Sequence, residues 1–317
     1  MQFHLSDADI VAFVHEDGVT RWRRFPYGRE RIERLVAQWR FLLESAVLAD
    51  VFGERYDLAE ERALFDEIGD WLWAPLEIGA HVKEVLLLPE GELFNLPWQA
   101  VRHGGADLID RHAFLYSPSL RHFGHALETR VRSNRVRIFL GSAGDLPHLK
   151  SEAQALAALT SGHTDIHDPS NRADWPNGES AKLWHYAGHA QLNRENPFYS
   201  SLVLNDGPLF AADFRLRTNN VWLATVAACQ TGAQPSLPGE EATGLVRSLL
   251  EMGARNVVAG HWPVADKSTA EWMTAFYKRV FDNAPLPSAV QSAAREVRER
   301  FPSAYHWAAF ALFGAGR

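Results

Sequence analysis

Short apolar runs alternate with helical patterns from residue 136 to the end of the chain. Four runs are predicted to be buried strands, at residues 136–140, 181–188, 221–228 and 256–260. Amphipathic spacing predicts helices at residues 149–159, 238–252, 265–281 and about 287–300, and Gly253 is the expected C-cap of the second of them. Strands and helices in alternation predict an α/β fold with a mainly parallel sheet that is covered on both faces.

The first 130 residues have a different, mainly helical pattern. We expect a helical stretch at residues 27–76, which includes a second helix at about 58–73. A single strand is expected at residues 82–88, and a polar, basic connector at 128–135. A chain of 317 residues is long enough for two subdomains. We therefore expect one subdomain at residues 1–130 and another at 131–317.

Two reactive side chains directly follow the two longest apolar runs. His189 follows the first run, and Cys229, which is the only cysteine, follows the second. The carboxyl ends of parallel strands are where α/β enzymes place their chemistry, and a neighbouring histidine favours the thiolate that makes cysteine a nucleophile. The pattern therefore suggests a cysteine hydrolase. The alternative is an inert buried cysteine, although Gln230-Thr231-Gly232 would end the strand and leave Cys229 at the sheet edge.

Composition narrows the classes of function. The formal net charge of −7 argues against a nucleic-acid-binding protein, for which a basic domain is expected. A single cysteine excludes an internal disulfide and makes a structural zinc site unexpected, so neither a metal nor a cofactor is predicted. The N-terminus lacks the pattern of a signal peptide, and no apolar run approaches about 20 residues. We expect a cytoplasmic protein that binds no membrane.

Eight short segments, taken together and in order, resemble one known family. They include the sequences HYAGH and AACQTG, which contain His189 and Cys229, and together they cover most of residues 80–317. The segments lie at residues 89–98, 116–120, 185–189, 227–232, 239–245, 253–259, 262–266 and 307–310. Their order resembles that of the CHAT domain, a caspase-like family that is similar to separase and is often found behind tetratricopeptide repeats.

The resemblance implies a fold and a catalytic pair. The fold would be a caspase-like three-layer sandwich, with a mainly parallel central sheet and an inactive half (residues 1–130) before the active half (131–317). The second histidine of HYAGH is the catalytic one in this family, which selects His189, with Cys229 as the nucleophile of a cysteine endopeptidase. His185 is then expected to be a strand residue with a satisfied ring, since a metal-binding His-x-x-x-His pair needs a helix.

The resemblance also implies an oxyanion hole, formed by the backbone N–H groups of Ala190 and Cys229. Family members commonly have glycine at position 190, so a Cβ there would add strain of about 1 kcal/mol if the position needs a positive φ. The chain also has His261 where an apolar residue is usual before Trp262.

Three acidic residues are candidates for the substrate pocket. In separase-like relatives an acidic segment near the position of Asp266 receives an arginine side chain, so cleavage after a basic residue is expected. The alternative for Asp266 is a helix N-cap, a position that aspartate favours. Glu240 and Glu241 are the other candidates, although carboxylates at a helix start are favourable through the helix dipole alone.

Three classes of function stay open. The first is an endopeptidase that cuts a specific protein partner and is controlled by a helical-repeat region or a sensor protein. The second is a catalytically silent caspase-like scaffold that acts by binding. The third is a cysteine hydrolase that acts on small amides, which the caspase-like segments disfavour.

Overall fold

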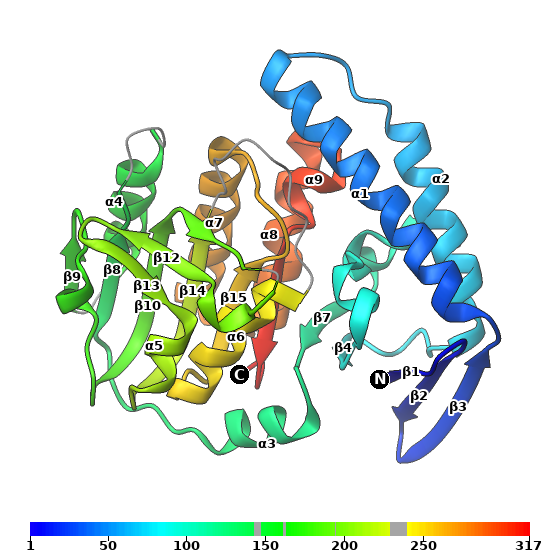
Figure 1. Cartoon of the computed structure of the whole chain (residues 1–317), viewed down its shortest axis with the longest axis horizontal. Coiled ribbons are helices and arrows are strands. Elements are labelled where there is room, and N and C mark those ends of the chain that lie inside the picture. Colours follow the sequence, from blue (N-terminus) through cyan, green and yellow to red (C-terminus); the bar gives the residue numbers. More distant parts are fainter. Residues whose placement is uncertain (143–146, 161–162, 194, 229–239) are drawn as a thin grey trace.

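The computed structural model describes the chain except residues 143–146, 161–162, 194 and 229–239, together with the side chains of residues 240–243. Its centre is one eight-stranded sheet (Figure 1). In spatial order the strands are β4 (Glu84–Leu87), β7 (Ala113–Tyr116), β16 (Phe310–Gly314), β15 (Asn256–Gly260), β14 (Asn220–Ala228), β10 (Ser180–Gly188), β8 (Val136–Leu140) and β9 (Thr164–His167). Only the pairing of β15 with β16 is antiparallel, which confirms the predicted mainly parallel sheet.

Helices cover both faces of this sheet. One face carries α4 (Leu149–Leu159), α7 (Asp266–Phe281) and α8 (Leu286–Arg300), and the opposite face carries α5 (Ala211–Arg215) and α6 (Glu240–Met252) (Figure 1). Successive side chains of β14 alternate between the faces: Thr225 contacts Tyr277 of α7, whereas Val226 lines a cavity together with Leu245 of α6. Burial on both sides explains why β10 and β14 are continuous apolar runs.

A small antiparallel sheet lies beside the central strands. It is formed by β11 (Ala190–Gln191), β12 (Ser201–Leu204) and β13 (Gly207–Phe210), in that order. Its first strand begins two residues after β10 ends, so His189 is the single residue between the two sheets.

The N-terminal region contains a sheet that the sequence did not indicate. Strands β1 (Gln2–Leu5), β2 (Ile10–Glu16) and β3 (Val19–Phe25) pair antiparallel, and the long helix α1 (Gly28–Phe52) and α2 (Leu58–Ile68) follow (Figure 1). A π-helical turn, Gly69–Trp73, extends α2 to the predicted end of that helix. The strand predicted at residues 82–88 is β4. Besides short 3-10 helices, the structure has the strands β5 (Arg102–His103) and β6 (Ala106–Asp107) and the helices α3 (Leu120–Glu128) and α9 (Ala304–Trp307).

Buried contacts join the N-terminal region to the rest of the chain. Trp39 of α1 packs edge-on against Trp262, with ring centroids 5.4 Å apart. The carboxylate of Glu61 accepts hydrogen bonds from the Ser303 hydroxyl (2.8 Å) and the Ala304 N–H (2.9 Å). Among the described residues, no helix is both long and apolar enough to cross a membrane.

Candidate active site at the ends of two paired strands

The ends of β10 and β14 lie side by side. The two strands pair in parallel from Ser180 with Asn220 to Gly188 with Ala228, the last residue of each strand. His189 directly follows Gly188, and Cys229 follows Ala228 in the sequence. Cys229 itself lies outside the described residues, so its pairing with His189 stays a prediction.

The backbone of His189 is held by two hydrogen bonds to its carbonyl oxygen. The Val203 N–H donates to it at 2.9 Å, and the Tyr186 hydroxyl donates to it at 2.7 Å. In an antiparallel ladder, the residue next to such a bonded pair directs its N–H away from the partner strand. Ala190, which pairs with Leu202, therefore turns its N–H away from β12.

Ala190 is not strained by its side chain. It lies in strand β11 and is not among the residues with a positive φ. The condition under which a Cβ at this position would cost energy is thus not met, and alanine can occupy it as well as glycine can.

An apolar cavity of about 40 Å³ opens at the same sheet edge, on the α6 face. Its described lining comes from the ends of the central strands, from the segment after His189 and from α6, and every residue in it is apolar. The lining residues are Ala190, Leu192, Val226, Ala228, Leu245, Val246, Ala259, Gly260, Trp262 and Pro263. Both Ala190 and Ala228, the sequence neighbours of the predicted dyad, are thus at its wall.

The family model of the CHAT domain matches residues 62–315. The chain belongs to the CHAT domain family. The match covers the whole central sheet, from β4 to β16, and all eight segments on which the resemblance rested. No curated protein matches the chain.

Solved structures share the caspase-like fold of this CHAT domain at low sequence identity. A protease matches with a TM-score of 0.56 and 11% identity over 81% of this chain and 68% of its own. Gingipain R, an Arg-specific cysteine proteinase, matches with a TM-score of 0.52 and 11% identity over 82% of this chain and 67% of its own. A chain of the Saccharomyces cerevisiae separase–securin complex matches at 0.49 and 17% identity, over 72% of this chain; the CHAT chain spans 15% of its length.

The acidic pocket candidates of the CHAT domain are at two helix starts. Asp266 is the first residue of α7 and half-buried, and its Oδ2 accepts a hydrogen bond from the backbone N–H of His148 (2.9 Å), which precedes α4. The N-cap of α7 is Ala265, so Asp266 does not cap its own helix. Asp266 is not one of the described residues that line the apolar cavity. Glu240 and Glu241 begin α6, and their side chains lie outside the description.

His185 is a buried strand residue, as expected, but the expectation of a satisfied ring is met at Nδ1 only: Nε2 has no hydrogen-bond partner. Its Nδ1 lies 2.9 Å from the Thr225 hydroxyl and 2.8 Å from the Tyr277 hydroxyl. On the other side, Nε2 lies 3.0 Å from Oε1 of the buried Glu152, an ion-pair distance without the angles of a hydrogen bond. Burial raises the pKa of Tyr277 well above its ordinary value, so its hydroxyl stays a donor. The network ties β10 and β14 to α4 and α7.

Sequence reasoning missed this network, although one signal was present. Glu152 interrupts the apolar stripe formed by Leu149, Ala153 and Leu156 of α4, and all four side chains are buried. A carboxylate on the buried face of a helix needs a partner, which here is His185.

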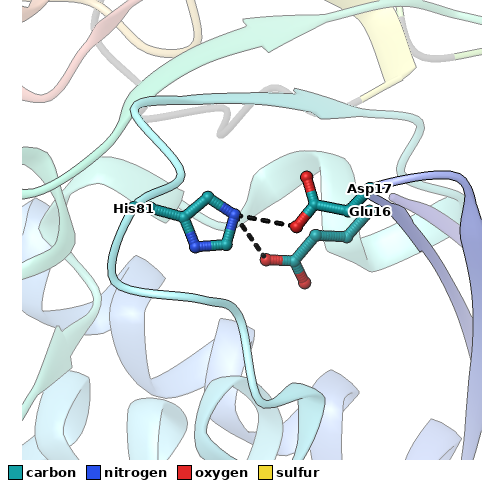
Figure 2. A group of neighbouring side chains, drawn as sticks. All are labelled: Glu16, Asp17 and His81. Atoms are coloured by element: carbon teal, nitrogen blue, oxygen red, sulfur yellow. Dashed lines mark hydrogen bonds and ion pairs between the residues drawn. The ribbon is translucent and has the colours of Figure 1, made fainter.

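A second group of titratable side chains lies in the N-terminal region, where β2 meets the loop before β4. The Nε2 atom of His81 lies 3.0 Å from Asp17 Oδ2 and 3.7 Å from Glu16 Oε1 (Figure 2). Glu16 also binds the Arg21 guanidinium (2.6 Å) and the Gly79 N–H (3.0 Å). The hydrogen bond from Arg21 lowers the pKa of Glu16, which keeps it ionised. With both oxygens of Glu16 bonded, the group fastens the β2–β3 hairpin to the loop.

Proposed function

We propose that this CHAT domain is a cysteine endopeptidase that cuts a specific protein partner with His189 and Cys229. The observation that carries the proposal is the pairing of Gly188 with Ala228, because it brings the ends of β10 and β14 to one sheet edge. The residues that follow these ends are a histidine and the only cysteine of the chain.

The chemistry follows from the two side chains. His189 favours the Cys229 thiolate, which attacks the peptide carbonyl and forms an acyl-enzyme. The imidazolium then gives its proton to the leaving amine, and the neutral ring takes a proton from the water that hydrolyses the acyl-enzyme. The cycle regenerates thiol and imidazole, and it needs neither a metal nor a cofactor.

The oxyanion of each tetrahedral intermediate would be bound by the N–H groups of Ala190 and Cys229. The ladder between β11 and β12 supports the role of Ala190, since its N–H is directed away from the partner strand. Removing one donor of this kind typically raises the barrier by about 3 to 4 kcal/mol.

The proposed cleavage site follows a basic residue. Asp266 is half-buried, and its Oδ2 accepts a hydrogen bond from the backbone of His148, so Oδ1 is the atom that would pair with a substrate arginine. Glu240 and Glu241 are the alternative acidic groups. The similarity to an Arg-specific proteinase supports a basic preference.

Control by a helical-repeat region or a sensor protein is part of the proposal. Helix α1 offers three exposed apolar side chains at helical spacing, Phe41, Leu48 and Phe52, to which such a partner could bind. The alternative function is a silent caspase-like scaffold.

A peptidyl probe that forms a covalent bond with thiolates separates enzyme from scaffold. Intact-mass analysis should show one probe on the wild-type protein, and the single cysteine assigns it to Cys229. Labelling should slow strongly in His189→Ala and be lost in Cys229→Ala. Equal labelling of wild type and His189→Ala, with no cleavage of any peptide in a library, would favour the scaffold.

Asp266→Asn tests the specificity. The wild type should prefer Arg over Lys before the scissile bond in a peptide library, because Arg pairs with a carboxylate in a bidentate way. In the variant, kcat/KM for Arg peptides should fall by a factor that corresponds to about 2 kcal/mol or more of transition-state stabilisation. If both proteins showed the same non-basic preference, Asp266 would have no role in the substrate pocket and would only hold the backbone of His148.

A further inference from the structure

The carbonyl group of His189 fixes the backbone directly beside the predicted catalytic ring. His189 lies after the end of β10 and before β11, so it belongs to neither strand. Its carbonyl oxygen nevertheless receives two donors, the N–H of Val203 and the hydroxyl of Tyr186. The Tyr186 hydroxyl also lies 3.0 Å from the Val203 carbonyl, so it sits where β10 and β12 converge.

Tyr186 reaches this position from inside the core. The side chain is 1% exposed and belongs to β10, three residues before His189. Burial raises the pKa of Tyr186 well above its ordinary value, so the hydroxyl remains protonated and can donate.

Two glycines make the space for this hydroxyl. Gly141 follows the end of β8, and Gly188 ends β10 with a φ of 158°. A Cβ added at either position would lie 2.6 Å from the Tyr186 hydroxyl oxygen, closer than such atoms approach. At Gly141 the same Cβ would also lie 2.7 Å from the Val203 carbonyl oxygen. The hydroxyl therefore occupies a slot that both glycines keep open.

We infer that Tyr186 is a positioning residue for the active site: its hydroxyl, in the slot between Gly141 and Gly188, sets the orientation of His189 and of the Ala190 N–H. The inference rests on the proposed function. The peptide unit that contains the His189 carbonyl also contains the Ala190 N–H, so one hydrogen bond orients the base and the oxyanion donor together. Small displacements of such groups reduce rates strongly.

Alkylation of Cys229 tests the inference without a substrate. The rate constant for reaction with iodoacetamide, measured across pH, reports the thiolate of the only cysteine. Wild type should react as a thiol with a pKa below about 8.5, and His189→Ala should return to an ordinary profile. Tyr186→Phe, which loses only the hydroxyl, should move most of the way toward His189→Ala. With a cleaved peptide, its kcat should fall roughly tenfold with KM little changed.

Tyr277→Phe is the matched control. It also removes a fully buried tyrosine hydroxyl with two partners, Thr225 and His185, but on the α7 face of the sheet. Its alkylation profile should equal that of the wild type when both are measured well below their unfolding temperatures. If Tyr186→Phe does not fold, Gly141→Ala, which crowds the same hydroxyl, replaces it in the alkylation experiment. Its profile should then move toward that of His189→Ala.

The outcomes separate the two claims. A wild-type profile equal to that of His189→Ala would overturn the dyad and this inference with it. If the thiol pKa is lowered in the wild type and equally lowered in Tyr186→Phe, the inference alone would be overturned. Equal shifts in Tyr186→Phe and Tyr277→Phe would also overturn it, because they would show general loosening of the core.

Discussion

At the scale of single residues, burial changes the chemistry of His261. The ring is buried among aromatic rings, with centroid distances of 5.5 Å to Tyr116, 6.0 Å to Phe313 and 6.2 Å to Trp262. Burial lowers the pKa of His261 to about 4, so the ring is neutral in the folded protein at neutral pH. The family resemblance led us to expect an apolar residue at this position, and the neutral ring packs there with its Nε2 buried and without a hydrogen-bond partner.

His261 should make the fold sensitive to acid. Its pKa is about 6.5 in the unfolded chain and lower in the folded one, so the unfolded state takes up more protons as the pH falls. The stability contributed by neutral His261 is complete above pH 6.5 and is lost as the pH falls toward 4. The free energy of unfolding should drop by about 2 to 3 kcal/mol between pH 7 and 4.5 from this residue.

His261→Phe tests this with urea unfolding at both pH values, because phenylalanine keeps the aromatic contacts and cannot be protonated. The variant should lose less stability on acidification than the wild type. Some acid sensitivity should remain, since burial also lowers the pKa of His112 and His306. An unchanged difference between pH 7 and 4.5 would show that His261 is protonated in the folded state.

At the scale of elements, local signals predicted the elements of residues 131–317 well. The bounds of β8, α4 and β15 are those expected, because an apolar run or an amphipathic stripe is a local property. The N-terminal sheet was missed because β3 is mostly exposed and rich in arginine. Its backbone pairs with β2, and Arg21 in it donates to the carbonyls of Leu76 and Glu77, contacts that lie 55 and 56 positions away in the sequence.

The same distinction applies to the candidate site. The ends of β10 and β14 could be predicted because each is marked by the end of an apolar run. The slot for Tyr186 could not, since it depends on the approach of Gly141 from another strand. The network of Glu152, His185 and Tyr277 likewise needs two helices to meet over the sheet.

Gly253 and Gly207 form a natural pair for testing how the C-terminal end of α6 packs against Asn219, the residue before β14. Both have a strongly positive φ, 115° and 119°. A Cβ at Gly253 would lie 1.9 Å from the Asn219 carbonyl oxygen, whereas one at Gly207 would meet nothing within 4 Å. Gly207→Ala should cost about 1 kcal/mol from its backbone alone. Gly253→Ala should cost at least about 2 kcal/mol more in urea unfolding, since the end of α6 and the backbone of Asn219 must move apart. Equal costs would mean that this junction adjusts freely.

At the scale of the whole molecule, the proposed boundary at residue 130 crosses one continuous sheet. Strands β4 and β7 precede it, and β7 pairs with β16 near the C-terminus. The buried Gln99 side chain adds to this junction, because its Nε2 donates to the carbonyls of Ala308 (2.6 Å) and Phe310 (3.2 Å). The pattern of the sequence changes near residue 130, but the residues on both sides of that position share a single hydrophobic core.

We expect residues 1–130 and 131–317 to unfold together. Urea unfolding followed by tryptophan fluorescence and by far-UV circular dichroism should give coincident single transitions. Gln99→Leu leaves two buried carbonyls without their donor, so it should lower the free energy of unfolding by about 1 to 3 kcal/mol and shift both transitions equally. Glu33→Ala, which removes an exposed ion pair with Arg29, should change it by less than about 0.5 kcal/mol. Two separate transitions, with Gln99→Leu moving only one of them, would establish two independent folding units and a structural boundary near residue 130.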